Sequence, residues 1–277
     1  MKVDYLSDLH IDFYFPKNKK ILDEDIKALY HPIITKGNRE IGNVLIIAGD
    51  IGHYNYQNIT ILKYLKENYY KHILCVLGNH DYYLLGKGTL NRYNNSFERV
   101  EEMRELINNE EGMYCLDGDV VNITGINFAG CDSWYNYGYV KRYFSSSIYS
   151  KDKINSLWSQ YLNDEKNIYG IDDFDEIWNT EISKIESIYE SCDVMVTHVN
   201  PSTNNDNIPI QYRNSITNTF FTFEGGKYLK EGNMRYWIFG HTHEQIEYFE
   251  HNVKCLCNPF GYPKELSNIR IKSFTIS

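Results

Sequence analysis

Side chains that can bind metal ions or transfer protons follow directly after short apolar runs at five places in the chain. The five segments are Ser7-Asp8-Leu9-His10, Gly49-Asp50, Gly78-Asn79-His80-Asp81, Thr197-His198 and Gly240-His241-Thr242-His243. In open α/β sheets, ligands bind at the carboxyl ends of strands, so we expect all five segments to meet at one edge. Their carboxylate, amide and imidazole groups form a mixed oxygen and nitrogen ligand set. Such a set suits Mn, Fe or Zn, whereas an all-oxygen site would favour Mg or Ca.

Each segment taken alone also has an ordinary structural explanation. An Asp-x-His sequence such as Asp8-Leu9-His10 is often a polar loop, and a single histidine such as His198 is often a core or surface residue. Gly78-Asn79 is a common turn sequence. The joint occurrence of all five segments, each after an apolar run, is what favours one shared site. In three of them a glycine precedes the functional residue, which lets the backbone approach a crowded site.

Hydrophobic periodicity indicates the elements that must position these segments. Short apolar runs predict strands at 3–6, 44–48, 73–77, 120–123, 126–129, 194–196, 236–239, 253–256 and 269–276. Apolar residues at helical spacing predict helices at 57–69, 97–107 and 175–189. Thr124-Gly125 predicts a tight hairpin turn. The chain begins as strand–helix–strand and becomes rich in strands later, so we expect an α/β sandwich of two sheets with helices outside.

No repeat or linker composition divides the chain, so we expect one domain over 1–277. Two stretches are predicted to be irregular. The first, at about 134–180, is dense in Tyr, Trp, Ser and Asn, and is expected to be an insertion or lid. The second, at 200–223, is dense in Asn and Thr. Long loops of this kind commonly carry function.

The overall charge argues against a nucleic-acid substrate. The formal net charge is −9, and a surface this acidic repels a phosphate backbone unless a local basic patch overcomes it. The densest basic run, Lys17-Asn18-Lys19-Lys20, is too short to form such a patch. A small anionic substrate stays compatible with this charge, because bound metal cations invert the local field.

Cysteine usage and hydropathy point to the cytoplasm. The six cysteines show no CxxC pair and no framework spacing, which favours reduced cysteines over disulfides. No segment approaches the roughly 18 uninterrupted apolar residues of a membrane span. The first residues predict a strand and not a signal peptide. We therefore expect a cytoplasmic protein without a membrane partner.

In this order, the five segments resemble the motifs of the calcineurin-like metallophosphoesterase family. The resemblance runs from Asp8 to His243. Beyond it, Cys257-Asn258-Pro259-Phe260-Gly261-Tyr262-Pro263 is similar to the Asn-Pro-x-Gly-Tyr ending of a branch of small bacterial phosphoesterases. Ala129-Gly130-Cys131-Asp132-Ser133-Trp134 resembles a strand end of that branch less closely. The family's fold implies two mixed β-sheets packed as a sandwich and flanked by helices, in agreement with the strands expected above.

The resemblance also implies a centre of two divalent metal ions. Three residues would hold each ion: Asp8, His10 and His243 the first, and Asn79, His198 and His241 the second. Asp50 would bridge both ions, and His80 would stand just outside them as general acid. A hydroxide bridging the two ions would attack the phosphorus. With an ordinary pKa near 6.5, His80 would then protonate the leaving alkoxide close to neutral pH.

The sequence departs from one branch of this superfamily at Asp50. Protein Ser/Thr phosphatases read Gly-Asp-x-x-Asp-Arg-Gly, whereas Gly49-Asp50-Ile51-Gly52-His53-Tyr54 lacks the second Asp and the Arg. Without that guanidinium clamp on the phosphate, a phosphoprotein substrate is disfavoured. His53 resembles the double-strand-break nuclease branch instead. It either lies just outside the metal ligands, near the substrate, or belongs to a simple turn.

Few other side chains are candidates for substrate contact. Arg142 and Arg213 lie in the two stretches expected to be irregular, where they either reach a substrate phosphate or remain surface residues. Tyr135, Tyr137 and Tyr139 either form an aromatic wall for a substrate ring or pack the insertion onto the sandwich.

Three hypotheses for the function follow. The leading one is a phosphoesterase that hydrolyses a small phosphate mono- or diester at two Mn, Fe or Zn ions. The second is a nuclease, which a basic groove would favour and a narrow capped pocket would disfavour. The third is a non-catalytic scaffold, which normally shows lost ligands, whereas all seven ligands and His80 are present here. The substrate, the native metals and the oligomeric state stay open at this point.

Overall fold

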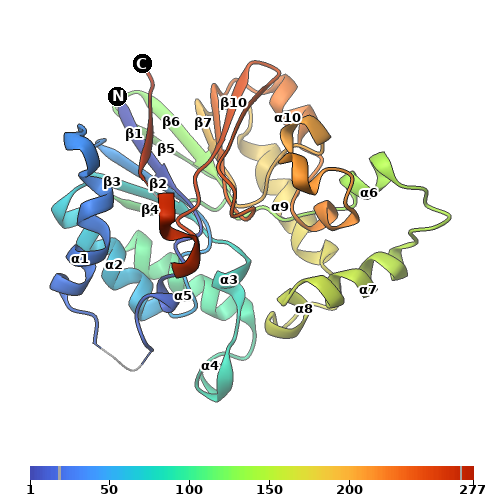
Figure 1. Ribbon diagram of the computed structural model, residues 1–277, viewed down its shortest axis with the longest axis horizontal. Coiled ribbons are helices and arrows are strands. Elements are labelled where there is room, and N and C mark those ends of the chain that lie inside the picture. Colours follow the sequence, from blue (N-terminus) through green and yellow to red (C-terminus); the bar gives the residue numbers. More distant parts are fainter. Residues whose placement is uncertain (18–19, 269) are drawn as a thin grey trace.

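Two mixed β-sheets face each other in the computed structural model, which describes residues 1–17, 20–268 and 270–277 (Figure 1). The first sheet has the order β11 (Lys272–Thr275), β1 (Lys2–Leu6), β2 (Val44–Ala48), β3 (His72–Val76) and β4 (Met113–Cys115). β1 to β4 are parallel and β11 is antiparallel. The two-sheet sandwich expected from the sequence is therefore confirmed.

The second sheet is also mostly parallel, with antiparallel strands at its edges. Its order is β5 (Asp119–Ile123), β6 (Ile126–Gly130), β7 (Val194–Val196), β8 (Tyr236–Phe239), β10 (Val253–Cys257) and β9 (Ile246–Glu250). β6, β7, β8 and β10 run parallel to one another. The predicted turn at Thr124-Gly125 is confirmed: both residues have positive φ, 48° and 89°, as a two-residue hairpin requires.

The core has two layers, because side chains alternate along each strand. In β2, Val44 and Ile46 face the other sheet, whereas Leu45 and Ile47 face the helices. All five residues of β2 are buried, as expected for a central parallel strand. Helices α1 (Asp23–Ile34), α2 (Asn55–Asn68) and α5 (Ser96–Asn108) lie beside the first sheet. Helices α9 (Asp175–Ile188) and α10 (Gly226–Glu231) lie beside the second (Figure 1).

The expectation that 134–180 is irregular is wrong. This stretch contains α6 (Gly138–Tyr143), α7 (Lys151–Tyr161), α8 (Asp164–Asn167) and the first turns of α9, and α6 to α8 stand apart from the sheets (Figure 1). The α7 helix is amphipathic, with Ile154 and Trp158 buried and the Ser150 side chain accepting a hydrogen bond from the Lys153 backbone N–H. The other stretch, 200–223, holds three short 3-10 turns at Asn205–Asn207, Ile210–Tyr212 and Ile216–Phe220.

Several other elements were not predicted. They are α1, the short helices α3 (Asn79–Tyr82), α4 (Gly86–Arg92) and α10, and strands β4 and β9. The predicted strand at 269–276 begins only at Lys272, and position 269 lies outside the described residues, as do positions 18 and 19 of the basic run. All six cysteines are free and buried. In the part of the chain that the structure describes, no helix is long and apolar enough to cross a membrane.

Candidate metal centre

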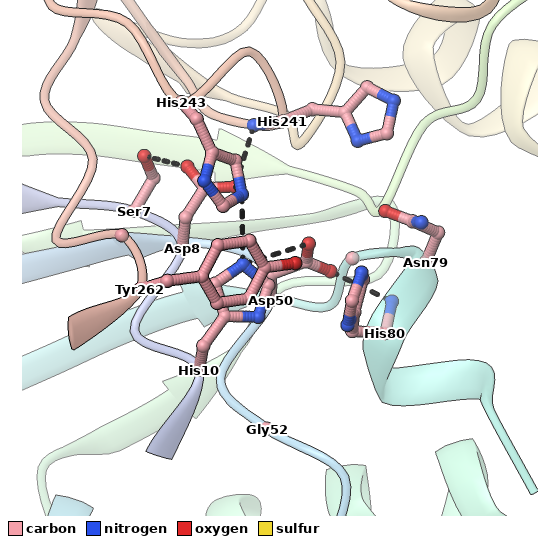
Figure 2. A network of polar contacts seen from close by, with 12 residues as sticks. Ser7, Asp8, His10, Asp50, Gly52, Asn79, His80, His241, His243 and Tyr262 are labelled. Carbon is pink, nitrogen blue, oxygen red and sulfur yellow. Dashed lines mark hydrogen bonds and ion pairs between the residues drawn. The ribbon is translucent and has the colours of Figure 1, made fainter. Parts of the chain in front are cut away.

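The five polar segments meet at one edge of the sandwich, as predicted, because the strands that precede them end there. Figure 2 shows Asp8, Asp50, Asn79 and His241 from these segments. Backbone hydrogen bonds join the loops to one another. The Asp8 N–H donates to Gly49 O at 3.0 Å, and the His10 N–H donates to Asp50 O at 3.1 Å. A backbone hydrogen bond also joins the loops that follow β7 and β8, since the Gly240 N–H donates to His198 O at 2.8 Å.

The backbone at these strand ends turns through the left-handed region. Five candidate ligands have positive φ between 43° and 69°: Asp8, His10, Asp50, His241 and His243. For a residue with a Cβ this conformation costs about 1–2 kcal/mol. Non-glycine residues with left-handed backbone are concentrated at functional sites. This set of five therefore marks the strand ends as a candidate functional site. The sequence alone gave no sign of this feature.

The glycines before the candidate ligands are required by close packing, as expected. A Cβ on Gly49 would lie 2.2 Å from His198 Nδ1, and Gly49 itself has a φ of +83°. A Cβ on Gly78 would lie 2.3 Å from Asp50 Oδ1. Neither position could hold a larger residue without displacing a candidate ligand.

A first group of ligand atoms comes from Asp8, His10, Asp50 and His243, all within 4.8 Å of one another. The Nε2 atoms of His10 and His243 are only 2.9 Å apart. Two nitrogens this close together could both bind one ion, for which metal–nitrogen distances are about 2.0–2.1 Å. His243 Nδ1 contacts Glu265 Oε2 at 3.0 Å, so its Nε2 is the atom that faces the group. The Asp8 carboxylate is held by Ser7 Oγ and by the His241 N–H.

A second group comes from Asp50, His198 and His241. A carbonyl oxygen only accepts hydrogen bonds, so the partners of both rings fix which nitrogen carries the proton. His198 Nδ1 donates to Ala48 O at 2.9 Å, and His241 Nε2 donates to Phe220 O at 2.9 Å. His198 Nε2 and His241 Nδ1 are therefore the atoms free to bind an ion. Asn79 Oδ1 lies 3.1 Å from His198 Nε2, beside the same group.

Asp50 belongs to both groups and lies between them. Its Oδ1 is 3.4 Å from His198 Nε2 in the second group, and its Oδ2 is 3.8 Å from His10 Nε2 in the first. Buried carboxylates and imidazoles that converge from two sides fit two divalent ions that share one carboxylate. The donor set therefore fits the metal centre that the sequence predicts.

Comparison with known proteins gives the family. The family model for calcineurin-like phosphoesterases matches residues 1–245. The chain belongs to this family. A curated relative, an uncharacterized protein of Acanthamoeba polyphaga mimivirus, is 24% identical over 277 residues, covering 95% of this chain and 92% of the relative.

Among solved structures, a phosphopantetheinyl hydrolase from Mycobacterium tuberculosis is similar to this chain. Its TM-score is 0.70 at 14% identity, covering 100% of this chain and 96% of that one. At this identity the likeness shows the shared fold alone. A hypothetical protein from Pyrococcus horikoshii gives a TM-score of 0.40 at 10% identity, covering 99% of this chain and 87% of that one. The family makes the chain a metal-dependent hydrolase with an α/β sandwich fold.

The electrostatics of this phosphoesterase centre depend on Asp50. Burial alone would raise the pKa of Asp50, but the neighbouring His198, His80 and His10 lower it well below the usual range. Burial would likewise lower the pKa of His198, but the Asp50 and Asp8 carboxylates raise it to about 10. Without metal ions, Asp50 and His198 therefore form a buried ion pair. In this pair the Nε2 atom of His198, which would bind an ion, carries a proton.

His80 is joined to His53 and Asp12 by a chain of hydrogen bonds. His53 Nδ1 lies 2.7 Å from Asp12 Oδ2, and His53 Nε2 lies 2.9 Å from His80 Nδ1. Because a carboxylate only accepts, His53 donates from Nδ1 and then accepts at Nε2 from His80. The other nitrogen of His80 remains for an exchangeable proton on the cavity side. Burial lowers the pKa of His80 to about 4, against the raising effect of the Asp50 and Asp12 charges. The ordinary pKa near 6.5 expected from the sequence is therefore wrong for this buried ring. His53 thus belongs to the site, just outside the candidate ligands.

The two arginines proposed as substrate contacts do not line the cavity in front of the ligands. Backbone carbonyls of its own loop hold Arg213, which donates to Ile208 O and Asp206 O at 3.0 Å each. Arg142 donates to Thr203 Oγ1 at 3.2 Å and lies over the Tyr143 ring. The packing interpretation holds for Tyr135 and Tyr139, whose side chains are fully buried. Tyr137 also packs inside the insertion, with its ring 4.7 Å from Phe174.

Three residues of the site were not predicted. Asp12, Asp164 and Glu265 are acids that each contact a candidate site residue: His53, Asn79 and His243 respectively. Asp12 alone had a signal in the sequence, since it continues the alternation Asp8-Leu9-His10-Ile11-Asp12. Asp164 lies in a polar stretch far from the motifs, whereas Glu265 follows the last quoted motif by two residues. Nothing in the sequence separates either residue from a surface acid.

Proposed function

We propose that this chain hydrolyses a small phosphate mono- or diester with the help of two divalent ions, Mn, Fe or Zn. One observation carries this function: Asp50 belongs to two separate groups of ligand atoms, and both groups open onto one cavity of about 520 Å³. Asp8, His10 and His243 would hold one ion, and Asn79, His198 and His241 the other, with Asp50 between them. A cavity of this size suits a small molecule.

When bound, two such ions polarise the phosphoryl oxygens and lower the pKa of the water that they share. The chain's own residues position the reaction. The buried Asp8 and Asp50 carboxylates leave the centre with excess positive charge, so an anionic phosphoryl group is attracted. His80 lines the cavity beside the ligands and would donate a proton to the leaving oxygen. The Asp50 and Asp12 carboxylates favour the protonated ring that such a donor needs, whereas burial opposes it and holds the pKa of His80 at about 4.

A nuclease is a weaker candidate. A positively charged groove is the usual requirement for a nucleic-acid backbone. Within the described ranges, no Lys or Arg lines the cavity. A scaffold is weaker still, since all seven candidate ligands and His80 are present in the sequence.

We also propose that the chain is one domain over 1–277 and that the 134–180 insertion serves as a lid. Tyr161, Leu162, Asn163 and Asp164 of this insertion line the cavity together with the candidate ligands. A cytoplasmic location belongs to the same proposal, because six free buried cysteines suit a reducing compartment.

Hydrolysis assays after metal loading test this function. The purified protein, stripped with chelator and loaded with Mn, Fe or Zn, should hydrolyse esters from a panel of mono- and diesters. The panel should include p-nitrophenyl phosphate, bis(p-nitrophenyl) phosphate and a phosphopantetheine ester. Asp50→Asn, which keeps the shape of the side chain and removes its charge, should abolish the activity. A folded, metal-loaded protein without activity on any of these esters, or an Asp50→Asn variant with full activity, would refute the proposal.

A further inference from the structure

The cavity in front of the candidate ligands has walls of contrasting chemistry. On one side lie the ligand groups with His80 and Tyr262 (Figure 2). The second wall comes from the insertion and from the 200–223 stretch, and its apolar members are Tyr161, Leu162, Ile208, Pro209, Tyr212 and Phe221. A bound phosphoryl group would therefore face the first wall, and whatever is esterified to it would face the second.

The charge on the second wall is the informative feature. In the described residues, no Lys or Arg side chain lines the cavity. The charged lining residues outside the two ligand groups and His80 are both acids, Asp164 and Glu265. The nearby Arg213 is held outside by the carbonyls of Ile208 and Asp206. A second phosphate on the substrate would thus meet no cation beyond the metal centre, and the exposed carboxylate of Glu265 would repel it.

Aromatic and apolar surface begins directly beside the ligands. The Phe221 ring lies 4.8 Å from the His241 ring. Further out, Tyr161 and Tyr212 expose 52% and 46% of their surface, so both rings are free to cover a flat or apolar group. Neutral polar residues, among them Asn163 and Thr217, complete the wall. This wall suits an uncharged group of mixed polarity.

We propose that the substrate carries a single phosphoryl group, joined to an uncharged and partly apolar or aromatic group that lies against Phe221, Tyr161 and Tyr212. Nucleoside polyphosphates and esters with a second phosphate are then poor substrates. This assignment rests on the proposed phosphoesterase function and narrows its substrate class. The size of the cavity and the chemistry of the metal ions alone would also allow polyphosphates as substrates.

Two substrates that differ only in a distal phosphate test the assignment. They are the p-nitrophenyl ester of thymidine 5′-phosphate and the same compound with an added 3′-phosphate. Both release p-nitrophenolate, so a difference in kcat/KM reports the distal phosphate and not the leaving group. The metal-loaded protein should prefer the first compound at least about tenfold, and the preference should shrink with added salt, which screens the charge.

A lysine on the wall should reverse the preference in part. Tyr212→Lys places an ammonium group on the cavity wall and should reduce the ratio of the two kcat/KM values at least about threefold. Ile148→Lys is the matched control, because Ile148 is 68% exposed and lies outside the cavity lining. It adds the same charge to the protein and should leave the ratio at its wild-type value.

The outcomes separate this assignment from the function on which it rests. If the wild-type protein hydrolyses both compounds with similar kcat/KM, the phosphoesterase function stands and the single-phosphate assignment is overturned. The assignment also fails if Ile148→Lys reduces the ratio as much as Tyr212→Lys does, since net charge and not the wall would then decide. If the folded, metal-loaded protein hydrolyses neither compound nor bis(p-nitrophenyl) phosphate, the proposed function fails and the assignment fails with it.

Discussion

The Asp164 carboxylate accepts a hydrogen bond of 2.8 Å from the side-chain amide of Asn79, across 85 residues of sequence. Tyr83 and Tyr135 donate to the same carboxylate, which is fully buried. Because the carboxylate acts as acceptor to all three, the NH₂ group of Asn79 must point toward it. The amide oxygen of Asn79 then faces His198 and the second group of ligand atoms.

Asp164 should therefore control metal affinity at the second group without being a ligand. Asp164→Asn can turn its own NH₂ toward Asn79 and allow the amide to flip, so metal affinity should fall about 10–100-fold. Titration of the metal-free protein with Mn or Zn, followed by calorimetry, measures this loss. Glu165→Gln removes the same charge from the neighbouring exposed position and should bind metal normally. Unchanged affinity in Asp164→Asn would show that the hydrogen bond does not orient Asn79.

His80 should act on the leaving group and not on metal binding. His80→Ala should lower kcat about 10²–10⁴-fold for an alkyl ester, whose alkoxide must be protonated as it departs. A nitrophenyl ester departs as a stable anion, so the variant should hydrolyse it at nearly the normal rate. Metal content, measured by atomic absorption, should be unchanged. A loss of the same size on both esters would mean that His80 only supports the loop around Asn79.

The sequence-based predictions were accurate where local sequence patterns determine the structure, and failed where contacts between distant residues determine it. Strands β2, β7 and β8 were predicted at their observed bounds, because buried β-branched and aromatic runs end there at Gly or Thr. Helix α1 was missed, since Pro32 lies inside its last turn and obscures the pattern. The candidate ligands were recognisable because each follows such a run. Asp164 was not, because its role depends on a contact with Asn79 that only the folded chain creates.

The left-handed backbone at His243 predicts an unusual stability difference between two variants. His243→Gly and His243→Ala both remove the imidazole, but only glycine adopts a φ of 51° without strain. In the metal-free protein, the Gly variant should be more stable than the Ala variant by about 1 kcal/mol, or about 2–4 °C in Tm. Thermal unfolding followed by circular dichroism measures this. An Ala variant at least as stable as the Gly variant would contradict the strain.

Metal binding should release protons. His198 has a pKa of about 10 in the metal-free protein, because Asp50 and Asp8 outweigh the effect of burial, so its Nε2 is protonated at neutral pH. That proton must leave before Nε2 can bind an ion. Apparent metal affinity should therefore rise with pH up to about 10, by about tenfold per pH unit for one proton. Calorimetry at pH 8 in buffers of different ionisation enthalpy should give at least one proton released, and a value of zero would contradict the ion pair.

The central claim is that Asp50 lies between two metal ions, and anomalous diffraction from crystals grown with Mn tests it most directly. Two anomalous peaks should lie about 3.5–4 Å apart, one beside His10 and His243 and the other beside His198 and His241. The Asp50 carboxylate should contact both. A single peak at full occupancy under saturating Mn, or two peaks of which only one contacts Asp50, would contradict the account.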